Sequence, residues 1–185
     1  MRILAIIPAR GGSQRLEKKN IHPIWGKPMI YWAINACKGS KYFIEPWVST
    51  EDEEIKQIVL KYGAKVHNRS TKLAKNKVYK QAVIRNACKY IFDVYGRHDI
   101  VISLQANSPQ IKSEHLDEAI DTFLKYERDE IFSVDENLMQ NAAFRIFKSD
   151  YVFQEDLSTN CGVFVCPLHD VHTIEDVKYI ENNYS

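Results

Sequence analysis

The sequence predicts an α/β fold in which three layers, αβα, form around a mostly parallel β-sheet. Short apolar runs of strand length alternate with longer segments of helical periodicity from residue 3 to residue 134, the pattern of strands joined by crossover helices. A polar loop follows the first apolar run, where open α/β sheets bind their ligands. The 185 residues show no linker, internal repeat or low-complexity segment, so we expect a single domain, 1–185, with a full core.

The first half of the chain predicts strands that alternate with helices. Three short apolar runs predict strands: residues 3–8, 45–50 and 64–69. Between them, segment 27–40 carries apolar residues at helical spacing and ends at Gly39, a residue type common at helix C-caps. Segment 50–63 opens with a Thr or Glu cap, has acidic residues in its first turn, and stops at Gly63. Both segments are therefore predicted helices.

The second half continues the alternation as far as residue 134 and then loses it. Three segments predict helices: residues 78–96, 113–127 and 173–184. Four segments predict strands: residues 99–105, 130–134, 142–150 and 161–167. The last two of these strands are separated by a polar stretch, so the order of the sheet beyond residue 134 does not follow from the pattern.

Composition excludes several classes of function. A formal net charge of +1 provides no whole-protein field to gather nucleic acid or an anionic membrane, so neither is expected as a partner. No apolar stretch approaches the roughly 20 residues of a membrane helix. The N-terminus is strand-like and resembles no signal peptide, which predicts a cytoplasmic protein. Four cysteines lack metal-ligand spacing and are expected to be free thiols: Cys37, Cys88, Cys161 and Cys166.

The loop after the first strand, "ARGGSQRLEKKN", concentrates positive charge and bare backbone. Gly11 and Gly12 let the main chain approach an anion and donate N–H groups to it. Arg10 offers a planar fork for phosphate oxygens, and Lys19 offers a point charge. There is neither a GxGxxG nor a GxxxxGK[ST] motif, so a dinucleotide fold and a P-loop ATPase are not expected. The competing interpretation of this loop is a solvated turn.

Two further motifs lie at predicted strand ends. In "LQANSP", Gln105 points to the ligand edge, where it can read hydroxyls or an amide, while Ser108 is explained as a cap of the next turn. In "VSTEDEEI", Glu51 to Glu54 allow either a metal cluster or a capped helix start exposed to water. We favour the capped helix start because acidic side chains suit the positive end of a helix dipole.

Several segments in order resemble the acylneuraminate cytidylyltransferase family, over about residues 3–135. The segments that carry the resemblance are "IIPARGGSQRLEKKNI", "GKPMIYWAI", "VSTEDEEI", "KYGA", the Arg and LA of "NRSTKLAKN", and "LQANSPQI". The resemblance implies a nucleotide-diphospho-sugar transferase-like (Rossmann-like) fold. It also implies an enzyme that transfers CMP from CTP to a 2-keto-3-deoxy sugar acid of the sialic, legionaminic or pseudaminic type and releases pyrophosphate.

The resemblance also implies site residues, a metal and partners. The implied nucleotide-binding residues are Ala9, Arg10, Gly11, Gly12, Ser13, Lys19, Asn20, Arg69 and Asn76. Gln105 is implied as the sugar contact, and Asp170 with His172 as the ligands of Mg²⁺ or Mn²⁺. We take Arg10, Lys19 and Asp170 as the catalytic residues. The expected partners are CTP and an acidic sugar, with a homodimer left open.

The chain departs from the family at several positions. His172 stands where a second metal carboxylate is usual, and Gln14, Glu17 and Asn76 replace a lysine, a proline and an aspartate. Arg15 lies next to the missing lysine charge. The region between "FSV" and "NCGVFV", where the family has its dimerisation and sugar-enclosing segment, is short. The alternative function is therefore a catalytically inactive nucleotide- or sugar-binding homologue on the same fold.

Overall fold

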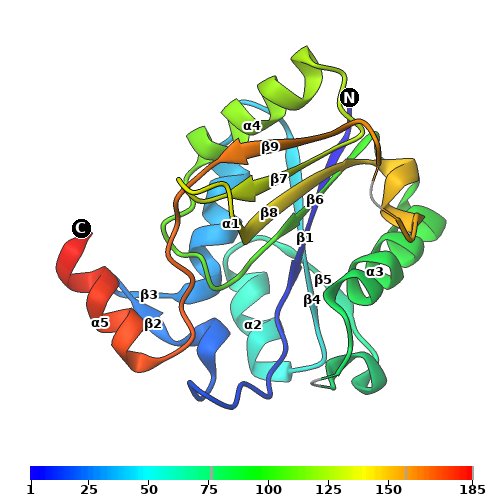
Figure 1. Cartoon of the computed structure of the whole chain (residues 1–185). Helices are drawn as coiled ribbons and strands as arrows, with labels where there is room; N and C mark the ends of the chain where they lie inside the picture. Colours follow the sequence, from blue (N-terminus) through cyan, green and yellow to red (C-terminus); the bar gives the residue numbers. More distant parts are fainter. Residues whose placement is uncertain (76, 157, 185) are drawn as a thin grey trace.

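The computed structural model describes residues 1–75, 77–156 and 158–184, and its centre is one seven-stranded sheet in the order β5-β4-β1-β6-β8-β7-β9 (Figure 1). The strands are β1 (Ile3–Pro8), β4 (Ile44–Thr50), β5 (Lys65–Asn68), β6 (Ile100–Leu104), β7 (Glu130–Val134), β8 (Gln140–Lys148) and β9 (Cys161–Val165). Only β8 runs against its neighbours in this sheet, and all other pairings are parallel. The predicted mostly parallel sheet is confirmed.

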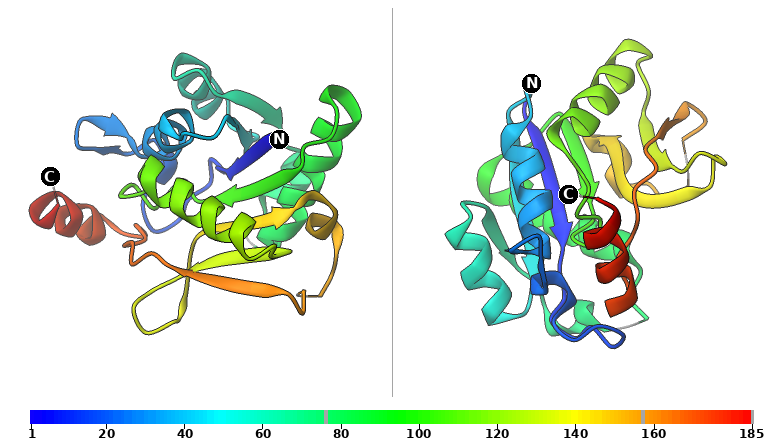
Figure 2. Two further views of the ribbon diagram at one scale, coloured as in Figure 1. Left: turned by 90° about the horizontal axis from the view of Figure 1, so that it is seen from above. Right: turned by 90° about the vertical axis from the view of Figure 1, so that its left-hand side faces the viewer.

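Helices cover both faces of this sheet, as predicted. The covering helices are α1 (Met29–Gly39), α2 (Glu53–Lys61), α3 (Lys80–Tyr95) and α4 (Ser113–Lys125), and the C-terminal segment forms α5 (Ile174–Asn183). The larger core cluster joins the sheet to α1, α2 and α4, whereas a second cluster joins its other face to α3 (Figures 1 and 2). Strand residues such as Leu4 and Ile6 contribute to the α3 side, and Ile3 and Ala5 to the opposite side, because successive side chains alternate across a sheet.

The structure corrects two predicted helix ends. The cap of α2 is Asp52 rather than Thr50 or Glu51, because the Asp52 carboxylate accepts the Ile55 N–H at 2.9 Å. At the end of α1, Gly39 is still helical and Ser40 is the C-cap.

Short elements that the periodicity did not reveal shape the connections. A small hairpin of β2 (Pro23–Ile24) and β3 (Lys27–Pro28) turns through Trp25 and Gly26, both at positive φ. Three 3-10 helices are η1 (Lys19–Ile21), η2 (Thr71–Ala74) and η3 (Ser149–Phe153). Such two- to five-residue elements are too short to produce a periodic apolar signal.

The C-terminal helix α5 lies at the margin of the molecule, beside the β2–β3 hairpin (Figure 2). A small apolar cluster holds it there, formed by Leu16, Ile24, Met29, Val171, Val177 and Ile180. The end of the chain is thereby packed against the loop that follows β1. In the part of the chain that the structure describes, no helix has the length and apolar character needed to cross a bilayer.

All four cysteines are free, as predicted, and they differ in accessibility. Burial raises the pKa of Cys37 and of Cys88 to about 12, and that of Cys166 to about 11. Cys161 is only half-buried, on β9 at the edge of the sheet. We therefore predict that a thiol reagent such as DTNB modifies native protein first at Cys161, because thiolate formation at the other three requires opening of the core.

The measurement is DTNB absorbance at pH 8 for the native protein, with Cys161→Ala as the comparison. The fast phase should disappear in this variant, and its three remaining cysteines should react only after denaturant is added. A fast phase that survives the substitution would show that one of the buried cysteines is accessible.

Candidate functional site

A cavity of about 170 Å³ lies at the carboxyl ends of β1, β5 and β6. The carboxyl end of β1 is the lower end of that strand in Figure 1. The predicted lining residues of this cavity come from the loops after β1, β5 and β6: Arg10, Ser13, Lys19, Asn20, Arg69 and Gln105. They converge because the carboxyl ends of neighbouring parallel strands meet at one edge. Asn107 and Lys80 also line this cavity, and neither was predicted. We call this cavity the phosphate pocket, because Arg10 and Lys19 were predicted to bind phosphate.

Glu51 connects three strand ends beneath this pocket. One carboxylate oxygen accepts the Gly11 N–H at 2.9 Å, and the other accepts Nε and Nη2 of Arg69 at 3.0 and 2.5 Å. Burial alone would raise the pKa of Glu51, but these hydrogen bonds hold it below its ordinary value. The acidic run is therefore not only a water-exposed helix start, because Glu51 is a structural partner of the site.

Gly11 has a different local role from the one predicted for the glycine pair. The Gly11 N–H donates to Glu51, and the Ala9 N–H donates to the Ser49 carbonyl at 3.0 Å. A Cβ atom at Gly11 would lie 2.2 Å from Oδ2 of Asp52, whereas one at Gly12 would meet nothing within 4 Å. Gly11 is thus required by the close approach of the helix α2 cap. The structure uses the N–H groups of residues 9 and 11 within the protein and does not point them at an anion.

Two neighbours hold the rest of this loop. Buried Asn20 donates from Nδ2 to the Arg10 carbonyl at 2.9 Å, so it shapes the loop as well as lining the pocket. Lys18 turns away at positive φ and pairs with Glu54 at 2.5 Å, both side chains being exposed. Of the cations in this loop, Arg10 and Lys19 line the pocket, as predicted, whereas Lys18 does not.

A pairing of two distant loops brings the C-terminal segment to the site. Asn107 exchanges hydrogen bonds with the main chain of Val171, at 2.8 and 3.1 Å. Ser108 donates its hydroxyl proton to Oδ1 of Asp170, and Gln110 accepts the His169 N–H at 2.8 Å. The prediction that Ser108 caps the next turn is wrong for its side chain, because its hydroxyl is bound to Asp170.

Each of the two predicted metal ligands contacts another side chain in the structure, Asp170 with Ser108 and His172 with Arg15. Nδ1 of His172 faces Nη2 of Arg15 at 3.1 Å, so that nitrogen is used. The Asp176 carboxylate accepts the N–H groups of His172 and Thr173, both at 2.8 Å, and so serves the start of α5. Within the described residues, no three His, Cys, Asp or Glu side chains lie together as ligands. Asp170 and His172 remain predicted ligands, but this arrangement does not fit a divalent ion held by the protein.

The electrostatics of the pocket favour an anion. Burial raises the pKa of Asp170, and the Ser108 hydrogen bond, His172, Lys80 and Lys19 oppose that shift. Burial lowers the pKa of Lys19, and so do the charges of Arg15 and Arg10. Several cations thus surround one carboxylate whose charged form is disfavoured, and a bound anion would relieve their mutual repulsion.

The remaining predicted residues are placed as follows. The main-chain N–H of Gln105 donates to the Ala143 carbonyl at 2.9 Å, and Gln105 lines the phosphate pocket. Asn76 lies outside the described residues. Ala9, Gly11 and Gly12 belong to the loop but do not line the cavity.

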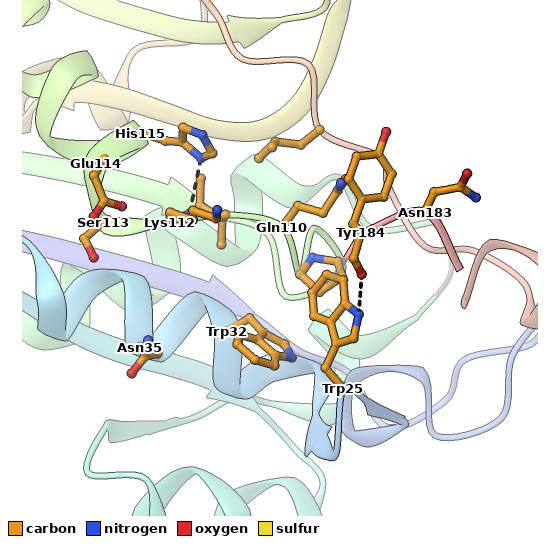
Figure 3. A pocket seen from close by; sticks show the side chains of 13 residues that line it. Trp25, Trp32, Asn35, Gln110, Lys112, Ser113, Glu114, His115, Asn183 and Tyr184 are labelled. Carbon is orange, nitrogen blue, oxygen red and sulfur yellow. Dashed lines mark hydrogen bonds between the residues drawn. The ribbon is translucent and has the colours of Figure 1, made fainter. Parts of the chain in front are cut away.

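Two further cavities border this region. One of about 240 Å³ is lined by Tyr79, Lys80, Gln81, Ser103, Gln140, Phe144 and Arg145, so it shares Lys80 with the phosphate pocket. The other is a groove of about 900 Å³ on the far side of loop 107–111, walled by the edge-to-face pair Trp25 and Trp32 and by Gln110 and His115 (Figure 3). No predicted site residue lines the groove.

We predict that Gly11→Ala lowers the free energy of unfolding by about 1–3 kcal/mol, because the new methyl group displaces the Asp52 cap. Gly12→Ala is the matched control and should change it by less than about 0.5 kcal/mol. Urea unfolding of the three proteins checks this. Equal effects of the two substitutions would contradict the packing role of Gly11.

Comparison with known proteins agrees with this site. The family model described as Cytidylyltransferase matches residues 4–160. The chain is 39% identical over 132 residues to N-acylneuraminate cytidylyltransferase A of Danio rerio, covering 71% of this chain and 30% of that protein. It is 36% identical over 137 residues to pseudaminic acid cytidylyltransferase of Campylobacter jejuni, covering 74% of this chain and 59% of that protein. The alignments thus span well under two thirds of either relative.

A solved structure extends the likeness to the whole fold. CMP:2-keto-3-deoxy-manno-octonic acid synthetase, solved in complex with CTP, superposes with a TM-score of 0.77 at 17% identity and covers 98% of each chain. This confirms the predicted nucleotidyltransferase-type fold. With the family model covering most of the chain, and with the six predicted side chains gathered in one cavity, the conclusion is that this chain belongs to the cytidylyltransferase family.

Proposed function

We propose that the chain binds CTP in the phosphate pocket and transfers CMP to a 2-keto-3-deoxy sugar acid, with release of pyrophosphate. The observation that carries this proposal is the convergence of Arg10, Lys19 and Arg69 on one cavity at the carboxyl edge of the sheet. The solved relative with CTP and the two curated relatives named above support the nucleotide and the class of acceptor.

In this proposal the chemistry is stabilisation of phosphate charge. The acceptor hydroxyl attacks the α-phosphorus, the bond to the bridging oxygen breaks, and pyrophosphate leaves. Arg10 and Lys19 stabilise the charge that builds on the phosphate oxygens, in a pocket whose cations are fixed before the nucleotide arrives. Asp170 is the catalytic carboxylate in this proposal; the Ser108 hydroxyl binds it, and its charge interacts with Lys19 and Lys80.

The cavity of about 240 Å³ beside the phosphate pocket is our candidate for the acceptor site. It shares Lys80 with the phosphate pocket, so an acceptor there would meet the nucleotide at its phosphates. Its polar residues include Ser103, Gln140 and Arg145, which suit hydroxyl and carboxylate groups. Gln105 is the predicted acceptor contact at the boundary. Sialic, legionaminic and pseudaminic acids are the acceptors to test.

A second function is favoured by one observation: the absence, within the described residues, of a group of three metal-ligating side chains. That function is nucleotide or sugar binding without turnover. The assay that separates the two functions contains Mg²⁺ or Mn²⁺, because the family resemblance implies one of these ions. Pyrophosphate release above a buffer control would exclude the inactive alternative.

We predict that CTP raises the melting temperature more than ATP does, and that pyrophosphate is released from CTP with at least one of the three sugar acids. Binding to the folded state alone stabilises the protein in proportion to the logarithm of ligand concentration over Kd. Thermal shift with each nucleotide and a coupled pyrophosphate assay are the measurements. Equal shifts with ATP and CTP would remove the support for cytidine.

We predict that Arg10→Ala weakens CTP binding by about tenfold or more, because a charge-assisted contact contributes about 1.5–3 kcal/mol. Lys18→Ala is the matched control, since Lys18 is exposed, pairs with Glu54, and does not line the pocket. Titration calorimetry gives both dissociation constants. If the two losses were equal, the loop would act only as a diffuse positive patch.

A further inference from the structure

Three lysines line the phosphate pocket, Lys19, Lys75 and Lys80, and the charges of Lys19 and Lys80 interact with Asp170. Lys19 follows the loop after β1, and Lys80 is the first residue of α3. Among the described residues, neither ammonium has a hydrogen-bond or ion-pair partner, whereas Lys18 nearby is paired with Glu54. Lysines that line a cavity without a protein partner are available for an anionic ligand.

The position of Lys80 is electrostatically unfavourable for the helix itself. The first turn of α3 contains no acidic residue and begins with this lysine, although the amino end of a helix carries partial positive charge. Burial lowers the pKa of Lys80, with Asp170 opposing the shift, even though the residue as a whole is exposed. A phosphate oxygen would offset the positive end of the helix dipole because it carries negative charge. It would also accept a hydrogen bond from the Lys80 ammonium in place of the water that burial removes.

Asp170 is a carboxylate whose charge acts on both of these lysines. Its charge interacts with both Lys19 and Lys80, and one of its oxygens already accepts the Ser108 hydroxyl. A divalent cation brought to Asp170 would meet two ammonium groups instead of the second carboxylate it requires, and His172 is engaged by Arg15. The charges at this point match an ammonium–phosphate–ammonium arrangement better than a metal chelate.

We propose that Lys80, together with Lys19, takes the place of a protein-bound divalent cation, binding the nucleotide triphosphate beside Asp170 so that nucleotide binding does not require Mg²⁺ or Mn²⁺. The inference rests on the proposed nucleotide site. Because Lys80 lines both the phosphate pocket and the neighbouring cavity, its ammonium contacts the phosphate nearest the acceptor.

The experiment compares CTP binding to the full chain in excess EDTA and in millimolar Mg²⁺, by titration calorimetry. The expected dissociation constants agree within about threefold, since the lysines bind metal-free triphosphate directly. Lys80→Ala should weaken binding in EDTA by about tenfold or more and should lose less in Mg²⁺, where the metal screens the phosphates. Lys72→Ala is the matched control, because Lys72 is exposed and does not line the pocket.

A second variant, Lys80→Glu, separates charge from side-chain bulk. The introduced Glu side chain places a second carboxylate near Asp170. CTP binding by this variant should therefore depend on Mg²⁺. Melting temperatures of all variants without ligand verify that each is folded. Loss of wild-type binding in EDTA, or equal behaviour of Lys80→Ala and Lys72→Ala, overturns this inference while leaving the CTP site in place. Absence of CTP binding under both conditions overturns the inference together with the proposed function.

Discussion

The contact on which the site depends most is the carboxylate of Glu51, which lies between the ends of β1, β4 and β5. It binds the Gly11 N–H on one side and the Arg69 guanidinium on the other. Arg69 is buried, and removing one partner from such a pair typically costs about 3–5 kcal/mol because the remaining charge has no compensation. The carboxylate therefore fixes the loop after β1 relative to the arginine after β5. Side chains from these two loops can then face one cavity without a ligand to organise them.

The second constraint is the pairing of loop 107–110 with segment 169–171. Asn107, Ser108 and Gln110 bind three consecutive positions of the C-terminal segment, at Val171, Asp170 and His169. Helix α5 continues this segment and packs beside the β2–β3 hairpin. Asp170, whose charge reaches Lys19 and Lys80, is thus held by contacts 59 to 64 residues apart in the sequence.

The sequence allowed the layers of the fold and six residues of the pocket to be predicted. Apolar periodicity specifies which segments become strands and helices, and residues that follow parallel strands must meet at one edge. This is why Arg10 and Gln105, far apart in the chain, were predicted together. The short hairpin at Trp25 and the strand order beyond residue 134 depend on tertiary packing, which periodicity does not encode.

Among the site residues that were missed, Glu51 and Lys80 were missed for identifiable physical reasons. Glu51 directly precedes Asp52, which caps α2, and the acidic residues of the first turn of that helix. It was therefore assigned to the same helix start, and its contact with Arg69 was not predicted. Lys80 resembles an ordinary surface lysine, but a lysine at the first position of a helix opposes the helix dipole. That local conflict was the signal in the sequence that could have identified it. The pairing of Ser108 with Asp170 left no comparable local signal.

The two candidate cavities are lined by different segments of the fold, so a change in one segment need not affect both cavities. The phosphate pocket is lined from the β1, β5 and β6 loops and from α3, whereas the neighbouring cavity takes Gln140, Phe144 and Arg145 from β8. Insertions or deletions between β7 and β9 therefore reshape the second cavity and leave the first almost unchanged. The segment between β7 and β9 is thus the part of the fold whose length alters the candidate acceptor cavity without altering the loops that line the phosphate pocket.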